Sequence, residues 1–567
     1  MERHQLTGES SQRTRRPMKP VSTPSRAIRQ QWLERVDSVM RSQGMAAAAQ
    51  LSLQALAAGV EHPALLNLAA SARYAEARFE EAAQLLKRAR ALAPSDPHIL
   101  NSLGICLKAV GQNEAALEAY AAALRADPDM AAAHFNRGAI FEGLNDIKRA
   151  RAAFERAAAL DQKYVEPLAS LAWLDAQAGD AASARGHAER ALAISPSNAL
   201  ASMALASADL QSGDLASTTA RLSQLSRDPA LSPVNRTIVL GLMGDLKDAE
   251  GQTGEAFAAY TASNSELKAL NAAQFEAPGK EKALAHAQRL IRWFESADPA
   301  PWREMPEQRP RAADPKAHVF LVGFPRSGTT LLESVLAAHP EVGSLEEKDC
   351  LAGSSQTYLA SDEGLERLAS ISPGEAVRQR DAYWSAVRSF GVEPRGRVFI
   401  DKMPLASVAL PLIAKLFPTA RVLFARRDPR DVVLSCFRRR FGMNASMYQL
   451  LTLEGAAAYY DAVMRLSELY RELLPLAWHE VRYEHLVEHF EATARAACDF
   501  LGLEWDEGMA DFAAKARSRG ISTPSAAQVA RGLNREGQGS WRRYAAQMAP
   551  VLPLLQPWIE RFGYAET

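Results

Sequence analysis

A glycine-bounded loop after an apolar run carries the clearest chemical signal in this sequence of 567 residues. Residues 319–322 are apolar and predict a buried strand. Gly323 and Gly328 bound the loop, and Thr329 and Thr330 lead into a predicted helix over residues 331–338. The first N–H groups of a helix lack intrahelical partners, and the helix dipole adds positive charge there. This order of elements predicts a site for an anion.

The spacing from Gly323 to Gly328 is that of a Walker A loop, but Thr329 stands where that motif has lysine. Without the lysine, the loop lacks the cation that contacts the β- and γ-phosphates of ATP or GTP. Arg326 supplies a cation inside the loop instead. The loop therefore suits a donor with one terminal anionic group, although an ordinary Gly-rich turn is the alternative.

Residues 324–331, FPRSGTTL, resemble the 5′-phosphosulfate loop of sulfotransferases that use 3′-phosphoadenosine 5′-phosphosulfate (PAPS). Residues 339–342, HPEV, and the later pair Glu346 and Glu347 resemble the tyrosylprotein sulfotransferase branch and its bacterial relatives with tetratricopeptide repeats. The resemblance implies transfer of a sulfuryl group from PAPS to an acceptor hydroxyl, without a metal. A protein tyrosine is the first choice of acceptor, and a carbohydrate or small-molecule hydroxyl is the alternative.

The same resemblance implies two anion sites for the donor. The 5′-phosphosulfate site would comprise Arg326, Ser327, Gly328, Thr329 and Thr330. The 3′-phosphate site would comprise Arg427, Ser435 and Arg439, with Ser435 and Arg439 on one face of a helix that starts after Asp428. Arginine suits a phosphate because its guanidinium donates two parallel hydrogen bonds. A solvated basic helix is the alternative, since residues 438–440 are all arginine.

The catalytic candidates implied by the family are Glu347, Arg326 and Lys402. A phenol of pKa ~10 needs a carboxylate within ~3 Å to take its proton, which is the role expected of Glu347, with Glu346 as the competing choice. Lys402 resembles the lysine that contacts the sulfuryl group, and Arg326 would meet charge on the bridging oxygen. His339 is a base by residue type, but its His-Pro turn indicates a structural role.

Two further donor contacts follow from the resemblance. Tyr483, in an RYE element, would pack on the adenine, although a core tyrosine is the alternative. Ser525 and residues 539–544, GSWRRY, resemble the loop that closes over the donor. Here the chain departs from the family pattern, because Ser540 precedes the tryptophan where a basic residue is common.

The elements that must position these residues alternate between strands and helices. Residues 397–400, 420–425 and 479–483 are predicted to form strands, and residues 410–417 a helix. Strands that alternate with helices predict a mostly parallel sheet, with ligands at the carboxyl ends of its strands. The candidate residues above follow those strand ends.

The region before this domain repeats with a period of 34 residues. Two series of alanines keep that step, and Asn145 takes a turn position where the related turns have Gly111, Gly179 and Gly213. The period is that of tetratricopeptide repeats, whose stacked helix pairs commonly bind a protein or peptide in their groove. A scaffold role is the alternative. The alanines of the two series are Ala48, Ala82, Ala116, Ala150 and Ala184, and Ala55, Ala89, Ala123, Ala157 and Ala191.

The predicted fold is an all-α tetratricopeptide superhelix followed by an α/β P-loop-type sulfotransferase domain. We expect a disordered tail over residues 1–26, repeats over 27–270, a helical and Pro-rich connector over 271–316 and the sulfotransferase domain over 317–567.

Composition narrows the class of protein further. Lys and Arg balance Asp and Glu at 66 each, so no basic field points to nucleic acid. The four cysteines lack metal spacing, no apolar run is long enough to span a membrane, and no secretory segment opens the chain. These features indicate a cytoplasmic location. A P-loop kinase with Asp401 as its acid, and a non-catalytic repeat adaptor, are the rival functions.

Overall fold

The computed structural model describes residues 25–304, 314–519, 525, 528–529, 532–535 and 537–564. The chain divides into two compact units, one of Met1–Leu144 with Ala152–Gln162 and the other of Asn145–Arg151 with Lys163–Thr567. The predicted disordered tail lies outside the described residues except for Ser25 and Arg26, as does the connector segment 305–313.

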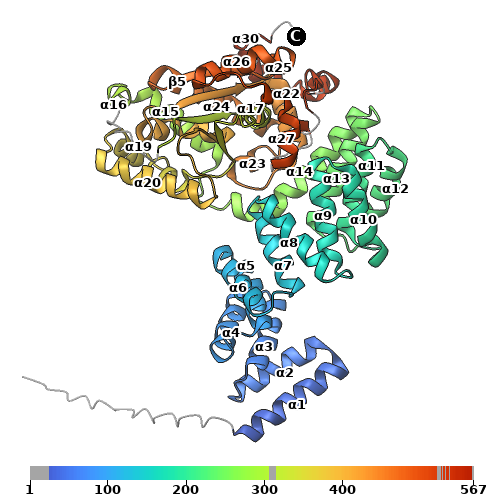
Figure 1. Ribbon diagram of the computed structural model, residues 1–567. Helices are drawn as coiled ribbons and strands as arrows, with labels where there is room; N and C mark the ends of the chain where they lie inside the picture. Colours follow the sequence, from blue (N-terminus) through green and yellow to red (C-terminus); the bar gives the residue numbers. More distant parts are fainter. Residues whose placement is uncertain are drawn as a thin grey trace, which may run out of the picture. The chain divides into compact units, whose positions relative to one another are not determined.

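The region before the sheet is built of successive helical hairpins, as the 34-residue period predicts (Figure 1). Its helices are α1 (Arg26–Gln43), α2 (Met45–Ala57), α3 (Pro63–Ala75), α4 (Phe79–Leu92), α5 (Pro97–Ala109), α6 (Asn113–Ala126), α7 (Ala131–Gly143), α8 (Ile147–Leu160), α9 (Val165–Ala178), α10 (Ala181–Ile194), α11 (Ala199–Gln211), α12 (Leu215–Ser226), α13 (Pro233–Ala249) and α14 (Thr253–Phe275).

Small residues recur where the helices of these hairpins cross. All ten alanines of the two series are 0% exposed. At another crossing, a Cβ on Gly104 would lie 2.4 Å from the ring of Tyr120, and a Cβ on Gly138 would lie 2.6 Å from the ring of Phe154. The aromatic side chain of one helix therefore fits only because its partner helix carries no side chain there.

The turn within each hairpin needs a left-handed residue. Glycine meets this need at Gly111 (φ 78°), Gly179 (φ 82°) and Gly213 (φ 80°), whereas Ala77 (φ 57°) and Asn145 (φ 55°) occupy the equivalent positions. A left-handed conformation costs an ordinary L-residue roughly 1–2 kcal/mol, and asparagine tolerates it better than alanine. Ala77 is therefore the strained member of the series.

The domain that follows contains one five-stranded sheet in the order β2-β3-β1-β4-β5, and every adjacent pair is parallel. The predicted parallel sheet is confirmed, but the sequence analysis missed β2. Its segment, VGSLE, has no apolar run and is only partly buried at the sheet edge. The strands are β1 (Ala317–Gly323), β2 (Val342–Glu346), β3 (Val398–Lys402), β4 (Arg421–Arg426) and β5 (Ala477–Arg482).

Helices cover both faces of the sheet (Figure 1). Val319 and Leu321 of β1 face a core shared with α17, while Phe320 and Val322 face a second core shared with α21 and α24. Because both faces of β1 are buried, residues 319–322 form a continuous apolar run. The α-helices are α15 (Ala283–Ser296), α16 (Ala300–Arg303), α17 (Thr329–Leu336), α18 (Ala352–Tyr358), α19 (Asp362–Ala369), α20 (Pro373–Ser389), α21 (Leu410–Leu416), α22 (Pro429–Arg438), α23 (Ala445–Gln449), α24 (Leu453–Leu473), α25 (Tyr483–Glu488), α26 (Phe490–Leu501), α27 (Phe512–Arg519), α29 (Ala545–Met548) and α30 (Leu552–Arg561). The short 3-10 helices are η1 (Pro404–Ala409), η2 (Glu507–Asp511) and η3 (Ser540–Tyr544).

The last hairpin of the repeat region packs into the core of the sheet domain. Tyr260 of α14 belongs to the same buried cluster as Phe320 and Phe424 of the sheet. Farther along α14, the rings of Phe275 and Tyr448 have centroids 5.2 Å apart. Helices α13 and α14 thus share one compact unit with the sheet domain. Within the described part of the chain, no helix is both long and apolar enough to cross a membrane.

Replacing Ala77 by glycine should stabilise the α3–α4 hairpin by ~0.5 kcal/mol, because the relief of left-handed strain exceeds the entropy that glycine adds to the unfolded chain. Slower hydrogen exchange of amides in α3 and α4 would report the gain. The control is Ala91→Gly in α4, where the residue is exposed and helical, and where glycine should speed exchange. Faster exchange in both variants would contradict the assignment of strain to Ala77.

Candidate active site

The predicted anion loop lies at the carboxyl end of β1 and leads directly into α17. A Cβ on Gly323 (φ 153°) would lie 2.4 Å from the carbonyl oxygen of Ala425, and one on Gly328 (φ 101°) would lie 2.8 Å from the Tyr483 ring. Both positions therefore require glycine. Gly328 is the N-cap of α17 and supplies no side-chain cap, so the first helical N–H groups face the loop.

Ser327 adds a hydroxyl to this loop. Its side chain is 2% exposed, and its Oγ has no hydrogen-bond partner among the described residues. A buried hydroxyl without a partner costs about 1–3 kcal/mol, which an anion at the loop would recover.

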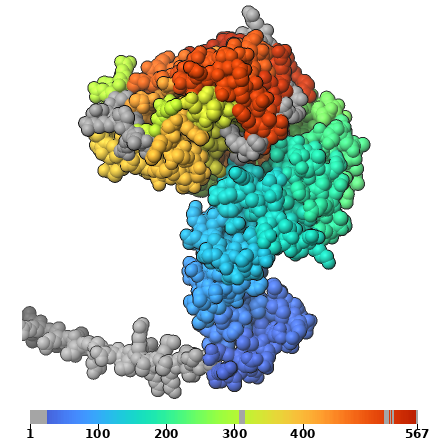
Figure 2. All heavy atoms as spheres, viewed as in Figure 1, coloured from blue at the N-terminus to red at the C-terminus, as the bar shows by residue number. Residues whose placement is uncertain are grey.

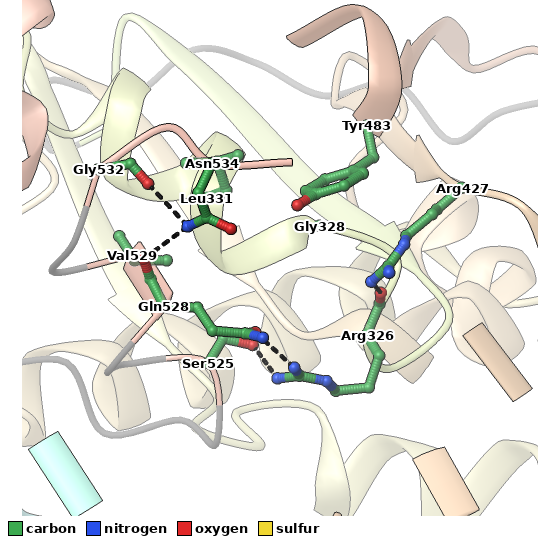
Figure 3. A pocket seen from close by; sticks show the side chains of 10 residues that line it. All are labelled: Arg326, Gly328, Leu331, Arg427, Tyr483, Ser525, Gln528, Val529, Gly532 and Asn534. Atoms are coloured by element: carbon green, nitrogen blue, oxygen red, sulfur yellow. Dashed lines mark hydrogen bonds between the residues drawn. The ribbon is translucent and has the colours of Figure 1, made fainter. Parts of the chain in front are cut away.

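Arg326 points its guanidinium back across the loop, from a backbone with φ 70° (Figure 3). Its Nε donates to Ser435 Oγ at 3.0 Å, its Nη2 donates to Gln528 Oε1 at 2.6 Å, and its Nη1 donates to Ser525 Oγ. Burial, together with the positive charges of Arg439 and Arg427, lowers the pKa of Arg326 to about 9. Three guanidinium groups thus gather at one place, which is a strong attraction for an anion.

Arg427 follows β4 and stacks on Tyr483, with its Cζ 4.7 Å from the ring centroid. It donates to the carbonyl oxygen of Arg326 at 3.2 Å and to that of Gly537, and its buried Nε has no partner among the described residues. Asp428 caps α22 by accepting from the N–H of Arg430 at 2.9 Å, as predicted.

These residues line one cavity of about 40 Å³ (Figure 3). This is room for a water molecule and not for a nucleotide, because Ser525, Gln528, Val529 and Asn534 line the cavity opposite the loop. The cavity brings together five predicted donor residues, namely Arg326, Gly328, Arg427, Tyr483 and Ser525. The sequence analysis missed Gln528, Val529 and Asn534, which follow Ser525 in a segment without a recognisable motif. Thr523 and Pro524, on which the prediction for Ser525 drew, lie outside the described residues.

Ser435 and Arg439 are related differently from what the sequence predicted. Ser435 lies in α22, but α22 ends at Arg438, and Arg439 has extended backbone angles (φ −101°, ψ 137°). The prediction that both share a helical face is therefore wrong. Arg439 nevertheless remains near the loop, since its charge acts on the pKa of Arg326.

The three other charged candidates meet at the carboxyl ends of β2 and β3. Lys402 is 0% exposed, with its Nζ 2.8 Å from Glu347 Oε1 and 3.4 Å from Glu346 Oε1. Its Cα pairs with Glu346 in β2 and with Leu321 in β1, two residues before the anion loop. Parallel register thus places the ion pairs beside the loop.

Burial by itself would lower the pKa of Lys402, but the carboxylates of Glu346, Glu347 and Glu333 outweigh it and raise that pKa. Lys402 lies on the face of the sheet that α17 covers, because its neighbours alternate between the two cores. Glu333 was missed by the sequence analysis. It is the one acidic residue in the otherwise uncharged helix TTLLESVL, and it is fully buried, where it accepts from Ser344 Oγ at 2.7 Å. That single charge in an uncharged helix was the feature of the sequence that could have identified Glu333 as a candidate site residue.

Glu347 extends the β2–β3 ladder, since its N–H donates to the carbonyl oxygen of Lys402 at 2.8 Å. Its φ is +48°, which is uncommon for a residue other than glycine. Across the described residues, four non-glycine residues have positive φ: Ala77 and Asn145 in repeat turns, and Arg326 and Glu347 here. Strained backbone of this kind clusters at functional sites.

His339 uses both ring nitrogens within the fold. Its Nδ1 accepts from the N–H of Glu341 at 3.1 Å, and its Nε2 lies 3.1 Å from the carbonyl oxygen of Glu504. These contacts agree with the structural role expected for it.

Asp401 faces the opposite side of the sheet from Lys402. Its Oδ2 accepts from the Tyr383 hydroxyl at 2.7 Å, and the same hydroxyl lies 2.9 Å from His318 Nε2. Burial raises the pKa of Asp401 to about 7 and lowers that of His318 to about 3. This network lies on the face of the sheet opposite to that of Lys402.

Comparison with known proteins agrees with this architecture. Residues 318–507 match the sulfotransferase family, and residues 103–165 match the tetratricopeptide repeat. The chain therefore contains one segment that matches the tetratricopeptide repeat and one that matches the sulfotransferase family, as the repeat and loop motifs implied.

The relatives include protein-tyrosine sulfotransferases of animals. The chain is 27% identical over 262 residues to Protein-tyrosine sulfotransferase 1 of Danio rerio, covering 43% of this chain and 72% of that protein. It is 28% identical to Protein-tyrosine sulfotransferase of Drosophila melanogaster, covering 42% and 51% respectively. An uncharacterised protein of Aquifex aeolicus is 25% identical, and the match spans 43% of this chain but only 33% of that protein.

Among solved structures, the sulfotransferase domain of the Synechococcus PCC 7002 olefin synthase is 25% identical and covers 42% of this chain and 98% of that domain, with a TM-score of 0.27. A tetratricopeptide repeat protein of Parabacteroides merdae is 17% identical and covers 42% of this chain and 93% of that one, with a TM-score of 0.33. Both TM-scores are below 0.5, so the assignment of the fold is based on the strand order and the helix pairs described above.

Substituting Asp401 by asparagine should remove a pH dependence of stability. The Asp401 pKa is raised from 3.8 to about 7, so the carboxyl contributes stability that is fully present below pH ~4 and lost as the pH rises through ~7. Between pH 4 and 8 the variant should gain about 2–4 kcal/mol in unfolding free energy relative to wild type. Denaturant unfolding across this range measures it. The exposed Asp511→Asn should follow the wild-type curve, and parallel curves for Asp401→Asn and wild type would refute the prediction.

Proposed function

We propose that this protein transfers a sulfuryl group from PAPS to an acceptor hydroxyl, with a protein tyrosine as the first choice of acceptor. The observation that carries the proposal is the pairing of two charged groupings on adjacent parallel strands. One is the arginine-lined anion loop after β1, and the other is Lys402 between Glu346 and Glu347. The names of the animal relatives favour tyrosine over a carbohydrate or small-molecule hydroxyl.

The anion loop and the residues near it carry hydrogen-bond donors for both phosphate-bearing ends of PAPS. The backbone N–H groups at the start of α17, the Ser327 hydroxyl and the side chains of Thr329 and Thr330 would hold the 5′-phosphosulfate. Arg427, Ser435 and Arg439 would hold the 3′-phosphate, and Tyr483 would pack on the adenine. The partnerless Ser327 Oγ and Arg427 Nε support this assignment, because each is a buried polar atom in need of an acceptor or donor from a ligand.

The charged residues then have separate tasks in the transfer. Glu347 accepts the proton of the acceptor hydroxyl as its oxygen forms a bond to sulfur. The bond from sulfur to the bridging oxygen breaks, and Arg326 balances the negative charge that remains on 3′-phosphoadenosine 5′-phosphate (PAP). Lys402, kept charged by the carboxylates around it, would neutralise the sulfuryl oxygens. Water is excluded from this ammonium, which strengthens the interaction.

The rival functions fit the geometry less well. Asp401, the candidate acid of a P-loop kinase, is hydrogen-bonded to Tyr383 on the face away from α17. A non-catalytic adaptor would have no need of strained Arg326 and Glu347. The repeats are proposed to bind a protein or peptide, while a cytoplasmic location and the absence of nucleic-acid binding stay predictions.

Calorimetric titration with PAP, ADP and ATP tests the donor site. PAP should bind without Mg²⁺ at micromolar concentration and more tightly than ADP or ATP. Arg427→Ala should weaken PAP binding by roughly 10–100-fold, because a charge-assisted contact to phosphate is worth about 1.5–3 kcal/mol. Arg421→Ala, at the amino end of the same strand, is the matched control and should bind PAP normally. Preference for ATP with Mg²⁺, or no binding of any nucleotide, would exclude the sulfotransferase.

Activity of two glutamate variants tests the base. With labelled PAPS and a tyrosine peptide, Glu347→Gln should lower kcat by roughly 10²–10⁴-fold, the usual contribution of a general base. Its PAP affinity should stay within about 3-fold of wild type, since the base contacts the acceptor and not the nucleotide. Glu346→Gln is the matched control. A larger loss of kcat in Glu346→Gln would transfer the role to Glu346, and label incorporated only into glycans would replace tyrosine as the acceptor.

A further inference from the structure

The carboxyl end of α22 is where the candidate donor site meets the last hairpin of the repeats. Ser435 of α22 accepts from Arg326, and the helix closes with Phe437 and Arg438. Helix α14 holds this end, because Asn264 Nδ2 donates to the Phe437 carbonyl oxygen at 2.9 Å and the rings of Phe257 and Phe437 lie 4.9 Å apart. The position of Ser435 therefore depends on a helix of the repeat region.

Asp248, near the end of α13, is the main charged contact between the two regions. Its side chain is 14% exposed. It accepts from Arg438 Nη2 at 2.5 Å, from Arg543 Nη1 at 2.9 Å and from the Tyr544 hydroxyl at 2.7 Å. The Arg438 guanidinium also lies 5.2 Å from the Tyr260 ring centroid and 5.1 Å from that of Tyr544. One carboxylate of the repeats thus joins α22 to the C-terminal segment 539–544.

The same C-terminal segment also contacts α22, and the residue just before it contacts Arg427, which is assigned to PAPS binding. Asp431, in the first turn of α22, accepts from the N–H of Gly539 at 2.7 Å, from that of Trp541 at 2.9 Å and from Ser540 Oγ at 2.9 Å. Gly537, just before it, accepts from Arg427. Asp248 therefore holds one end of the segment whose other end is bonded to Arg427. In Figure 2 the red C-terminal surface meets the green surface of the last repeat helices.

A second aspartate of α13, Asp245, lies near Arg439, another residue assigned to the 3′-phosphate. Asp245 Oδ1 accepts from the Tyr260 hydroxyl at 2.8 Å, and its Oδ2 lies 3.9 Å from Arg439 Nη1. Arg427, Ser435 and Arg439 are thus each within one or two contacts of α13 or α14. These are the three residues assigned above to the 3′-phosphate.

We propose that Asp248 is a positioning residue for the 3′-phosphate end of the donor, so that the last repeat hairpin is a working part of the nucleotide site. This inference rests on the proposed function. It assigns the hairpin a task that a partner-binding groove does not have, namely to hold α22 and segment 537–544 at the separation that a 3′-phosphate requires.

The rival explanation is that Asp248 is only a structural ion pair of the repeats. Asp209 provides the comparison, because it is equally a buried carboxylate at the end of a repeat helix. It lies in α11, is 1% exposed and pairs with Arg185 at 2.7 Å and Arg221 at 2.8 Å. Both these arginines are repeat residues, in α10 and α12, so the two ion pairs of Asp209 stay within the repeats.

The experiment compares the full chain with Asp248→Asn and Asp209→Asn by calorimetry, using PAP and adenosine 5′-phosphate. The second nucleotide lacks only the 3′-phosphate, so the ratio of the two dissociation constants reports that group alone. In Asp248→Asn, PAP should bind about 10-fold more weakly while adenosine 5′-phosphate changes by less than about 2-fold. Asp209→Asn should leave the ratio unchanged even if its thermal unfolding temperature falls.

A gentler variant, Tyr544→Phe, keeps the ring and removes one hydrogen bond to Asp248, so PAP binding should weaken by about 2–3-fold with the same selectivity. Equal weakening of both nucleotides, or no change in the ratio in either Asp248→Asn or Tyr544→Phe, would overturn the inference. Wild-type protein that does not prefer PAP to adenosine 5′-phosphate would instead overturn the proposed function. The two failures are therefore distinguishable.

Discussion

An ammonium group that water cannot reach is costly unless carboxylates lie beside it, and Lys402 is such a group. Its charge is balanced by Glu346 and Glu347 at the end of β2 and by Glu333 on α17. Three elements must therefore come together around one side chain. The register of β2 against β3 places Glu346 opposite Lys402, and a shift of one residue would turn that carboxylate to the other face of the sheet. The ion pairs thus depend on the sheet, and they reinforce it.

The parallel sheet also explains why the anion loop and the ion pairs lie at the same edge. Parallel strands end on one side, so the loop after β1 and the residues that end β2 and β3 have no other place to go. Two of these residues, Arg326 and Glu347, adopt positive φ without being glycine. Each is held in that conformation by contacts to neighbouring strands and helices, including the N–H of Glu347 on Lys402 and the guanidinium of Arg326 on Ser435. The surrounding fold therefore stabilises the strained backbone of both residues at this edge of the sheet.

The repeat region and the sheet domain are not simply joined end to end. Tyr260 of α14 is buried in the core that covers the sheet, and Asp248 of α13 bonds to both α22 and the C-terminal segment. Because α22 also carries Ser435, the last repeat hairpin and the candidate donor site share a helix. A change at α13 or α14 would therefore reach the anion loop through α22. A repeat region that only recruited a partner would not need such contacts.

The sequence by itself determined the features that depend on local spacing. Ten alanines at a step of 34 residues predicted the helical hairpins, because every hairpin crosses its neighbour at the same point and leaves no room for a larger side chain. The run from Gly323 to Thr330 predicted the anion loop, because glycine and a helix start within eight residues leave few alternatives. Tertiary structure alone decided what depends on distant partners. β2 lacks an apolar run and became a strand only by pairing with β3, which brought Glu347 to Lys402. Asp248 is separated from Arg438 by 190 residues, and no spacing within the chain indicates that they meet. Such contacts depend on how separate helices pack, and a pattern of neighbouring residues carries no record of that packing.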